Sequence, residues 1–199
     1  GSLHLLLRRA RPATLARTRW QQDHRVDFAA PQGLAALPAA TQAYCCLGTT
    51  IKVAGSQAAF RAVDLDAVLA FARAARSAGV TRFAVVSALG ASTKSASFYS
   101  RTKGEMEAAL ATLGFDCLVI TRPSLLAGSR QALGQAARPA EQWALALARP
   151  LSGLIPAAWR PIEAATVARA MRRALDAGEP GVHVIESAAL QRLGQPGAP

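Results

Sequence analysis

Short apolar runs alternate along the chain with longer segments in which apolar residues recur every three or four positions. The short runs are typical of buried strands, and the longer pattern is typical of amphipathic helices. The pattern predicts strands over residues 3–9, 24–30, 43–48, 82–88, 117–121 and 181–187. Strands that alternate with helices indicate parallel βαβ units, so we expect an α/β fold.

Helices are predicted over residues 56–78, 99–113 and 163–177. Ser56 can cap the first of them, and Gly79 can end it. The periodicity is weaker over residues 131–160, which we expect to be a segment on the substrate side, with a helix near 141–148. A polar tail is expected after the last strand.

The composition favours one domain that covers residues 1–199, since 51% of the residues are hydrophobic and can form a substantial core. No apolar run reaches the roughly 18 residues that a membrane span needs, and no leader is recognisable. We therefore expect a cytoplasmic protein that does not enter a membrane. Three cysteines, Cys45, Cys46 and Cys117, are too few for a disulfide framework and are interpreted as small buried residues.

The net charge of +11 raises the question of a nucleic-acid partner. The basic residues are scattered, however, and no aromatic residues suited to stacking on bases stand among them. We expect no dedicated nucleic-acid function. His4, His24 and His183 show no spacing typical of a metal site, so no metal is expected.

Tyr99 and Lys103 stand four residues apart in the run FYSRTKGE. In a helix this spacing places both side chains on one face. An ammonium group beside a phenol favours the phenolate, so a tyrosine with a pKa near ~10 in water would exchange a proton closer to neutrality. The pair is the first candidate for catalysis, the alternative being a solvated helix start. Glu105 and Glu107 are interpreted as part of a solvated helix face.

Polar and small residues follow the predicted strands at the edge where open parallel sheets bind ligands. Ser87 ends the fourth strand, 12 residues before Tyr99, so its hydroxyl can approach the phenol across the intervening loop. The other residues at this edge are Arg8 and Arg9, Cys46, Leu47 and Gly48, and Arg122, Pro123 and Ser124.

A strand-end serine followed by Tyr-x-x-x-Lys on the next helix resembles the short-chain dehydrogenase/reductase superfamily. The segments CCLGTT, AGSQAAFRAVDLD, FAVVSALGAS, FYSRTKGEMEAAL and RPSLLAGSR are similar to its atypical NAD(P)H-binding members near the Tat-interacting-protein-like oxidoreductases. The resemblance spans most of residues 3–195. It implies a Rossmann-like, doubly wound parallel sheet.

The resemblance also implies roles for individual residues. Tyr99 would be the general acid or base, Lys103 would lower the phenol pKa and bind the nicotinamide ribose, and Ser87 would orient the substrate oxygen.

Further positions are implied to bind the cofactor. Arg8 and Arg9 would pair with a 2′-phosphate, which favours NADP over NAD, unless they are only a solvated strand end. The remaining implied cofactor contacts are Asp27 and Phe28 beside adenine, the loop of Cys46, Leu47 and Gly48, and Pro123 and Ser124. For Phe28, simple core packing is an equal alternative.

The chain departs from the family pattern in two places. It contains no G-x-x-G-x-x-G phosphate-binding turn and begins at what resembles the second strand of the fold. Either about 30 further residues precede it, which we favour, or it is a shortened variant. Asp64 stands where many active members have an asparagine, and it could be an ordinary exposed helix charge.

The sequence thus predicts an NADP-dependent oxidoreductase that acts on an unidentified carbonyl or alcohol. The alternative is an NADP(H)-binding sensor or scaffold with little catalysis. A homodimer is compatible with either.

Overall fold

The structure, a computed structural model, describes residues 2–8, 10–11, 16, 18–28, 30–34, 37–127 and 156–197. Its longer strands are β1 (Leu3–Leu7), β2 (Gln21–Arg25), β3 (Gln42–Cys45), β4 (Arg82–Val86), β5 (Cys117–Arg122) and β8 (Gly181–Glu186). Two short strands, β6 (Leu126–Ala127) and β7 (Ile162–Glu163), complete the set within these residues.

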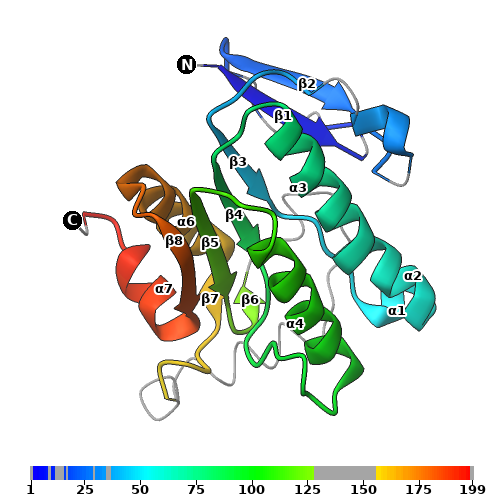
Figure 1. The fold of residues 1–199 in the computed structure, drawn as a ribbon. Coiled ribbons are helices and arrows are strands. Elements are labelled where there is room, and N and C mark those ends of the chain that lie inside the picture. Colours follow the sequence, from blue (N-terminus) through cyan, green and yellow to red (C-terminus); the bar gives the residue numbers. More distant parts are fainter. Residues whose placement is uncertain are drawn as a thin grey trace.

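The strands form three groups, and every pairing in them is parallel (Figure 1). β3, β4, β5 and β8 form a four-stranded sheet in that order, β1 pairs with β2, and β6 pairs with β7. The two larger groups are separate, with β1 and β3 as the neighbouring edges of the two sheets. The predicted α/β fold with parallel strands is confirmed.

The helices connect successive strands. Between β3 and β4 lie α1 (Ile51–Ala54), α2 (Gln57–Arg61), the π-helical segment η2 (Ala62–Ala67) and α3 (Val68–Ser77). α4 (Phe98–Ala111) follows β4, α6 (Ala164–Ala177) precedes β8, and α7 (Ser187–Leu193) follows it. A short 3₁₀ helix, η1 (Pro31–Leu34), follows β2.

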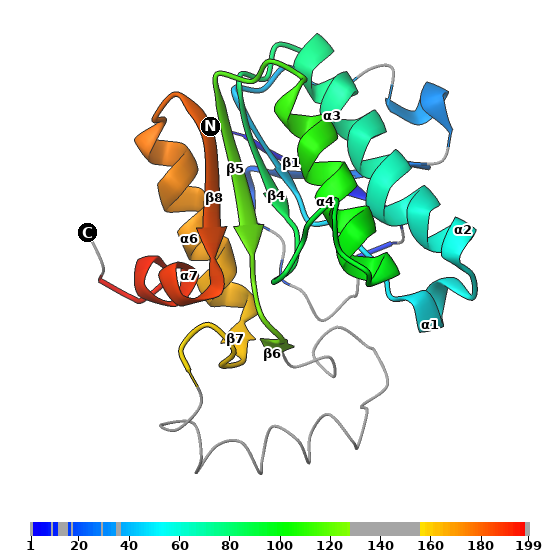
Figure 2. The ribbon, with the colours of Figure 1, turned by 60° about the horizontal axis from the view of Figure 1, so that its bottom comes forward.

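The helices cover both faces of the four-stranded sheet, with α3 and α4 on one side and α6 on the other (Figure 2). Successive strand residues point to opposite faces, and the core divides accordingly. Phe83 and Val85 of β4 pack in the cluster under α3 and α4, whereas Ala84 between them packs against Met171 and Leu175 of α6. The doubly wound arrangement is therefore confirmed for this sheet.

Two sequence predictions need correction. The second strand was placed over residues 24–30, but β2 covers Gln21–Arg25, because its register on β1 pairs Leu3 with Gln21 and Leu7 with Arg25. The prediction rested on the apolar residues Val26 and Phe28. Both are core residues, but they follow the end of the strand. The expected polar tail contains α7, whose Leu190 is fully buried.

The predicted helix over residues 56–78 is continuous, but its middle part is a π-helix rather than an α-helix. Ser56 caps α2 by accepting a hydrogen bond from the Ala59 amide at 3.1 Å, as expected. The chain then widens into the π-helical segment η2 before it resumes as α3.

The segment expected on the substrate side lies largely outside the described residues, as does the helix expected near residues 141–148. Among the described helices, none combines the length and the apolarity that crossing a membrane requires.

Candidate functional site

The candidate site lies at the carboxyl-terminal edge of the four-stranded sheet. Because β3, β4 and β5 are parallel, the residues that follow them, Cys46 to Thr50, Ser87 and Pro123, emerge at one edge. α1 follows the first of these loops, and the chain reaches α4 from the second (Figure 2). The edge therefore gathers most of the residues that the sequence singled out.

Helix α4 carries Tyr99, Lys103 and Glu107 at four-residue intervals, which places them along one face. Lys103 and Glu107 are buried, and Tyr99 is partly buried. The expected side-by-side position of Tyr99 and Lys103 on a helix is thus present.

The ammonium group of Lys103 is held by a carboxylate that the sequence did not assign to it. Lys103 Nζ lies 2.7 Å from Asp64 Oδ1, and the two side chains are only 4% and 1% exposed. The second carboxylate oxygen, Oδ2, accepts a hydrogen bond of 2.8 Å from the backbone amide of Thr49. Asp64 therefore joins helix α4 to the loop after β3. The interpretation of Asp64 as an exposed helix charge is wrong.

The π-helical turn explains how Asp64 comes to lie inside the protein. Asp64 sits in η2, where the extra residue per turn shifts the side-chain positions between α2 and α3, and such turns often occur at functional sites. Just before it, the buried Phe60 packs on Phe98 and on Tyr99, with ring centroids 5.8 and 5.5 Å apart. This aromatic contact joins the start of α4 to the end of α2, just before the π-helical turn.

The electrostatics of Tyr99 differ from the expectation. Burial raises the pKa of the phenol above its usual 10.0, and the nearby Asp64 carboxylate raises it further. The prediction of a lowered pKa for Tyr99 is therefore wrong for this arrangement, in which the Lys103 ammonium is paired with Asp64. Tyr99 is consequently a neutral phenol, with its proton in place, at physiological pH.

Ser87 takes part in a second polar network. This network involves Glu107, which lies on the same face of α4 as Tyr99 and Lys103 but further along the helix. Its hydroxyl donates to Glu107 Oε1 at 2.5 Å. Arg122, at the end of β5, donates to both oxygens of Glu107 at 3.1 and 2.6 Å and to Glu186 at 2.9 Å. The hydrogen bond with Glu107 raises the pKa of the Arg122 guanidinium. Glu107 is thus not a solvated helix residue, as the sequence indicated, but a buried acceptor.

This network turns the Ser87 hydroxyl toward a residue two helical turns beyond Tyr99, which corresponds to about 12 Å along the axis of α4. In this structure its hydrogen bond is therefore with Glu107, and it has none with the phenol among the bonds of the described residues.

The predicted cofactor-binding residues are only partly gathered at this edge. Cys46, Leu47 and Gly48 follow β3 directly, and Gly48 lies beside Asp64. The Pro123 carbonyl accepts a hydrogen bond of 3.0 Å from the Leu89 amide, which ties the ends of β4 and β5 together. Ser124 is turned toward α7 and the segment before β7: it donates to the Arg160 carbonyl and accepts from the Ser187 hydroxyl.

The residues near β1 and β2 are more separate. Arg8 is exposed directly after β1, and Arg9 lies outside the described residues. Asp27 is exposed, while Phe28 is buried and packs edge-on against Phe71 with ring centroids 6.3 Å apart. The core-packing alternative for Phe28 is therefore what the structure contains.

Sequence reasoning missed three residues that shape the site. Asp64 and Glu107 are charged yet buried, and the signal for Glu107 was its place four residues beyond Lys103 on the same face. Gly104 lets helix α4 approach the loop of residues 90–97, because a Cβ there would lie 2.3 Å from the Ser92 carbonyl carbon. A glycine inside a helix was the available signal for this close approach.

Two sets of known proteins are similar to this chain in sequence. Protein HTATIP2 of Rattus norvegicus is 37% identical over 156 residues, which is 76% of this chain and 61% of the rat protein. The mitochondrial protein fmp52 of Emericella nidulans is 44% identical over 95 residues, which is 48% of this chain and 39% of that protein. These similarities agree with the resemblance to the atypical short-chain dehydrogenase/reductases that the sequence indicated. The chain spans about two fifths to three fifths of the length of these relatives. No family model matches it.

Solved structures share the fold of this chain. Bordetella bronchiseptica WbmH, in complex with NAD⁺, superposes with a TM-score of 0.69 at 15% identity, over 94% of this chain and 67% of that one. Pseudomonas aeruginosa RMD, complexed with NADPH, gives a TM-score of 0.59 at 19% identity, over 88% and 72%. The fold is therefore that of Rossmann proteins that have been solved with NAD⁺ or NADPH.

The comparisons also correct one expectation. Several fungal relatives of this chain are mitochondrial proteins by name, which contradicts the expected cytoplasmic location. That expectation rested on the lack of a recognisable leader, and such a lack is not informative in a chain that spans only part of its relatives.

Proposed function

We propose that this protein is an NADP-dependent reductase in which Tyr99 donates a proton to the oxygen of a small carbonyl substrate. The observation that carries the proposal is the protonated Tyr99 beside the Lys103–Asp64 pair at the ligand-binding edge of a parallel sheet. A phenol with a raised pKa holds its proton at neutral pH, as a general acid must. The site therefore favours reduction of a carbonyl over oxidation of an alcohol.

Lys103 supports this step in two ways. Its ammonium group has three donors, and Asp64 occupies one of them, so others remain for the phenolate that forms on proton transfer and for a ribose hydroxyl. Asp64, in turn, fixes the ammonium by a buried ion pair and is anchored by the Thr49 amide. Asp64 is thus a positioning residue, which holds the Lys103 ammonium group close to Tyr99.

The residues present fit part of a nicotinamide dinucleotide. The cofactor would supply the hydride, and Lys103 would hold its nicotinamide ribose. A Cβ on Gly48 would meet only Asp64 Oδ1, at 3.5 Å, among the described atoms within 4 Å, so this backbone is open to a ligand. The 199 residues contain no Gly-rich turn for the pyrophosphate, and we assign that contact to none of them.

Ser87 has a narrower role in this proposal than its family position implies. Its proton is committed to Glu107, which leaves the oxygen lone pairs free to accept a hydrogen bond. It would therefore accept a hydrogen bond from an alcohol product rather than donate one to a carbonyl.

The preference for NADP rests on charge at the end of β1. Arg8 is exposed there, and Arg9 is the next residue in the sequence. Guanidinium groups form strong, often bidentate, hydrogen bonds to phosphate.

The test is NADPH oxidation with a panel of aldehydes and ketones, for the parent protein and for Tyr99→Phe. Tyr99→Phe should abolish turnover and leave NADPH affinity nearly unchanged, because it removes the acid and retains the ring on Phe60. Tyr44→Phe is the matched control, since Tyr44 is the other tyrosine and its hydroxyl donates to Gln42, on β3. A fully active Tyr99→Phe protein would contradict the proposal.

A second function is favoured by the way the polar groups are paired. Asp64 neutralises Lys103, and Glu107 binds the Ser87 proton, so two of the three expected catalytic groups are already engaged. A dinucleotide-binding sensor or scaffold would have these features without turnover. NADPH binding without turnover on any carbonyl, together with cofactor-dependent capture of a partner, would favour this second function.

A further inference from the structure

Two histidines from neighbouring strands meet outside the candidate site. His4 belongs to β1 and His24 to β2, and Nδ1 of His4 lies 3.0 Å from Nε2 of His24. The ring centroids are 5.2 Å apart, and the ring planes are inclined by 34°. Both side chains are partly buried, and neither has a part in the function proposed above.

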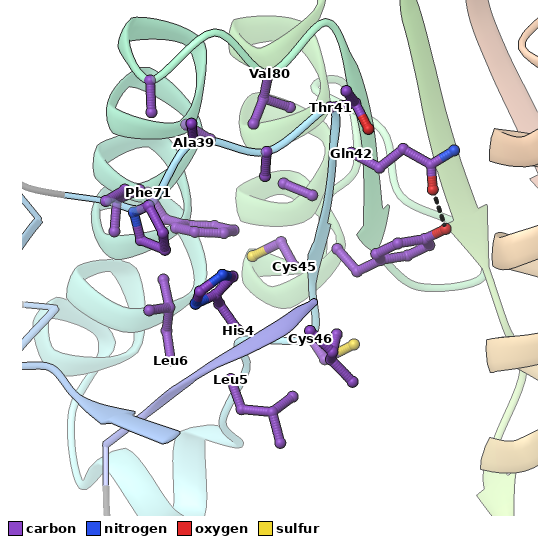
Figure 3. Close-up of a pocket in the computed structure, with 18 of the residues that line it drawn as sticks. His4, Leu5, Leu6, Ala39, Thr41, Gln42, Cys45, Cys46, Phe71 and Val80 are labelled. Atoms are coloured by element: carbon purple, nitrogen blue, oxygen red, sulfur yellow. Dashed lines mark hydrogen bonds between the residues drawn. The ribbon is translucent and has the colours of Figure 1, made fainter. Parts of the chain in front are cut away.

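The parallel register of β1 and β2 explains this contact. It pairs His4 with Gln22 and Leu6 with His24, so His24 lies beside the residue two positions after His4. Alternate residues of a strand point to one face. Figure 3, a view of the cavity beside β1, shows His4 and Leu6 on one side of this strand and Leu5 on the other. The two histidines are therefore diagonal neighbours on one face, although 20 positions separate them in the sequence.

The two nitrogens have nearly the separation of two ligands of one metal ion. Nitrogens bound at about 2.0–2.1 Å to one metal are about 2.9 Å apart at a right angle and about 3.3 Å apart at the tetrahedral angle. The observed 3.0 Å is close to the first value. Ligands at right angles are typical of the square-planar and tetragonal sites of Cu²⁺ and Ni²⁺.

The protonation of the rings becomes suitable for a metal after one change. The present hydrogen bond uses one N–H donor and one lone pair, whereas a metal ion uses two lone pairs. His4 Nε2 lies 3.2 Å from Ser2 Oγ, so a proton on Nε2 can be donated there while Nδ1 keeps its lone pair. Metal-bound histidines commonly donate their other ring N–H in this way. On metal binding, the proton of His24 then moves from Nε2 to Nδ1, and both rings stay neutral.

The rings are also able to turn toward one ion. Their lone pairs must converge on a point beside the line that joins the two nitrogens. The χ2 angle of a histidine has broad preferences, so this rotation costs little. The adjacent carboxylate, Asp23, is registered with Leu5 on the other face and forms an ion pair of 2.7 Å with Arg11.

We propose that His4 and His24 form a binding site for one Ni²⁺ or Cu²⁺ ion, which cross-links β1 to β2. In the part of the chain that the structure describes, no group of three or more His, Cys, Asp or Glu side chains could hold a metal. Water or a small ligand would therefore fill the other coordination positions. Because the ion binds both strands only when they are paired, it should stabilise the folded protein.

The first experiment is a calorimetric titration of the tag-free chain with Ni²⁺, and we expect one ion per chain. His4→Gln and His24→Gln should each weaken binding by roughly tenfold or more, because glutamine stays polar but removes an imidazole ligand. His183→Gln is the matched control, since His183 is the third histidine and its Nε2 contacts the Glu179 and Pro180 carbonyls. An unchanged affinity in either of the first two variants, or no binding at about 1 mM Ni²⁺, would overturn the site.

The second experiment examines the coordination in the unaltered protein. X-ray absorption at the nickel edge should show two imidazole rings, with nitrogens at about 2.1 Å, and no sulfur ligand. Ni²⁺ should also raise the urea midpoint of the parent and of Cys46→Ser, which removes the exposed thiol, but not that of His24→Gln. One imidazole or none, a nickel–sulfur contact, or an equal rise in His24→Gln would overturn the proposal.

Discussion

Lys103 and Asp64 form an ion pair of 2.7 Å that is almost completely withdrawn from solvent, with side-chain exposures of 4% and 1%. Two buried charges are tolerated because each compensates the other and because the Thr49 amide satisfies the second carboxylate oxygen. The pair links the loop after β3 to helix α4. Burial raises the pKa of Tyr99, and the Asp64 carboxylate raises it further. The catalytic proposal therefore depends on a residue outside the Ser-Tyr-Lys pattern.

Replacing Asp64 by asparagine should lower the pKa of Tyr99 and reduce stability. Asparagine removes the charge that raises the phenol pKa and leaves the Lys103 ammonium without an anionic partner. Breaking a buried ion pair on one side costs about 3–5 kcal/mol. Ultraviolet titration of tyrosinate in a Tyr44→Phe background isolates Tyr99, because the chain has two tyrosines. Urea unfolding measures the loss of stability.

Asp66→Asn is the control for this experiment, since Asp66 lies on the same π-helical segment but is exposed. It should change neither the titration nor the urea midpoint appreciably. If Asp64→Asn also left the Tyr99 titration where it was, the coupling between the carboxylate and the phenol would be refuted.

The proposed reduction should have a characteristic dependence on pH. The active form of Tyr99 is the protonated phenol, and its pKa lies above 10.0. The rate constant for carbonyl reduction should therefore stay level through neutral pH and decline only above pH 10.0, as the phenol loses its proton. A decline near neutrality would mean that a different group, or a phenol of lowered pKa, controls the reaction. Measurement of kcat at saturating NADPH against pH decides between them.

The sequence allowed us to predict which residues share a face of one helix or lie at the end of one strand. It did not allow us to predict which side chains of different elements pair with each other. Tyr99, Lys103 and Glu107 share a face because helical periodicity requires it, and the strand ends follow from the βαβ pattern. Asp64 could not be paired with Lys103 in this way, because η2 departs from the ordinary helical period. The second strand was predicted too late in the sequence because Val26 and Phe28 are apolar. Apolar residues of a loop can pack into a core just as those of a strand do.

Reversing the charge at the end of β1 should alter cofactor preference. Arg8→Glu combined with Arg9→Glu should weaken NADPH binding far more than NADH binding, because only the former has a 2′-phosphate to pair with guanidinium groups. Calorimetric titration with both cofactors measures this difference. Arg73→Glu together with Arg76→Glu, on the exposed side of α3, changes the net charge equally and should affect both cofactors alike. Equal losses in the β1 variant would remove the reason to prefer NADP.

Gly104→Ala should destabilise the protein, although helix propensity alone predicts the opposite. In the interior of a helix, alanine is favoured over glycine by about 1 kcal/mol. Here the added Cβ would lie 2.3 Å from the Ser92 carbonyl carbon and 2.4 Å from the Thr93 nitrogen, which are backbone atoms that cannot rotate away. Helix α4 or the loop must therefore shift, and overpacking of this kind costs about 1–3 kcal/mol.

The sign of the change makes this measurement decisive. A lower urea midpoint with an unchanged dependence on denaturant would show that the close approach of α4 to the loop exists in solution. A raised midpoint would show that α4 and the loop lie further apart than in this structure. The variant should also lose activity if the proposal is right, because the same contact sets the position of Tyr99 and Lys103 on the helix relative to the strand ends.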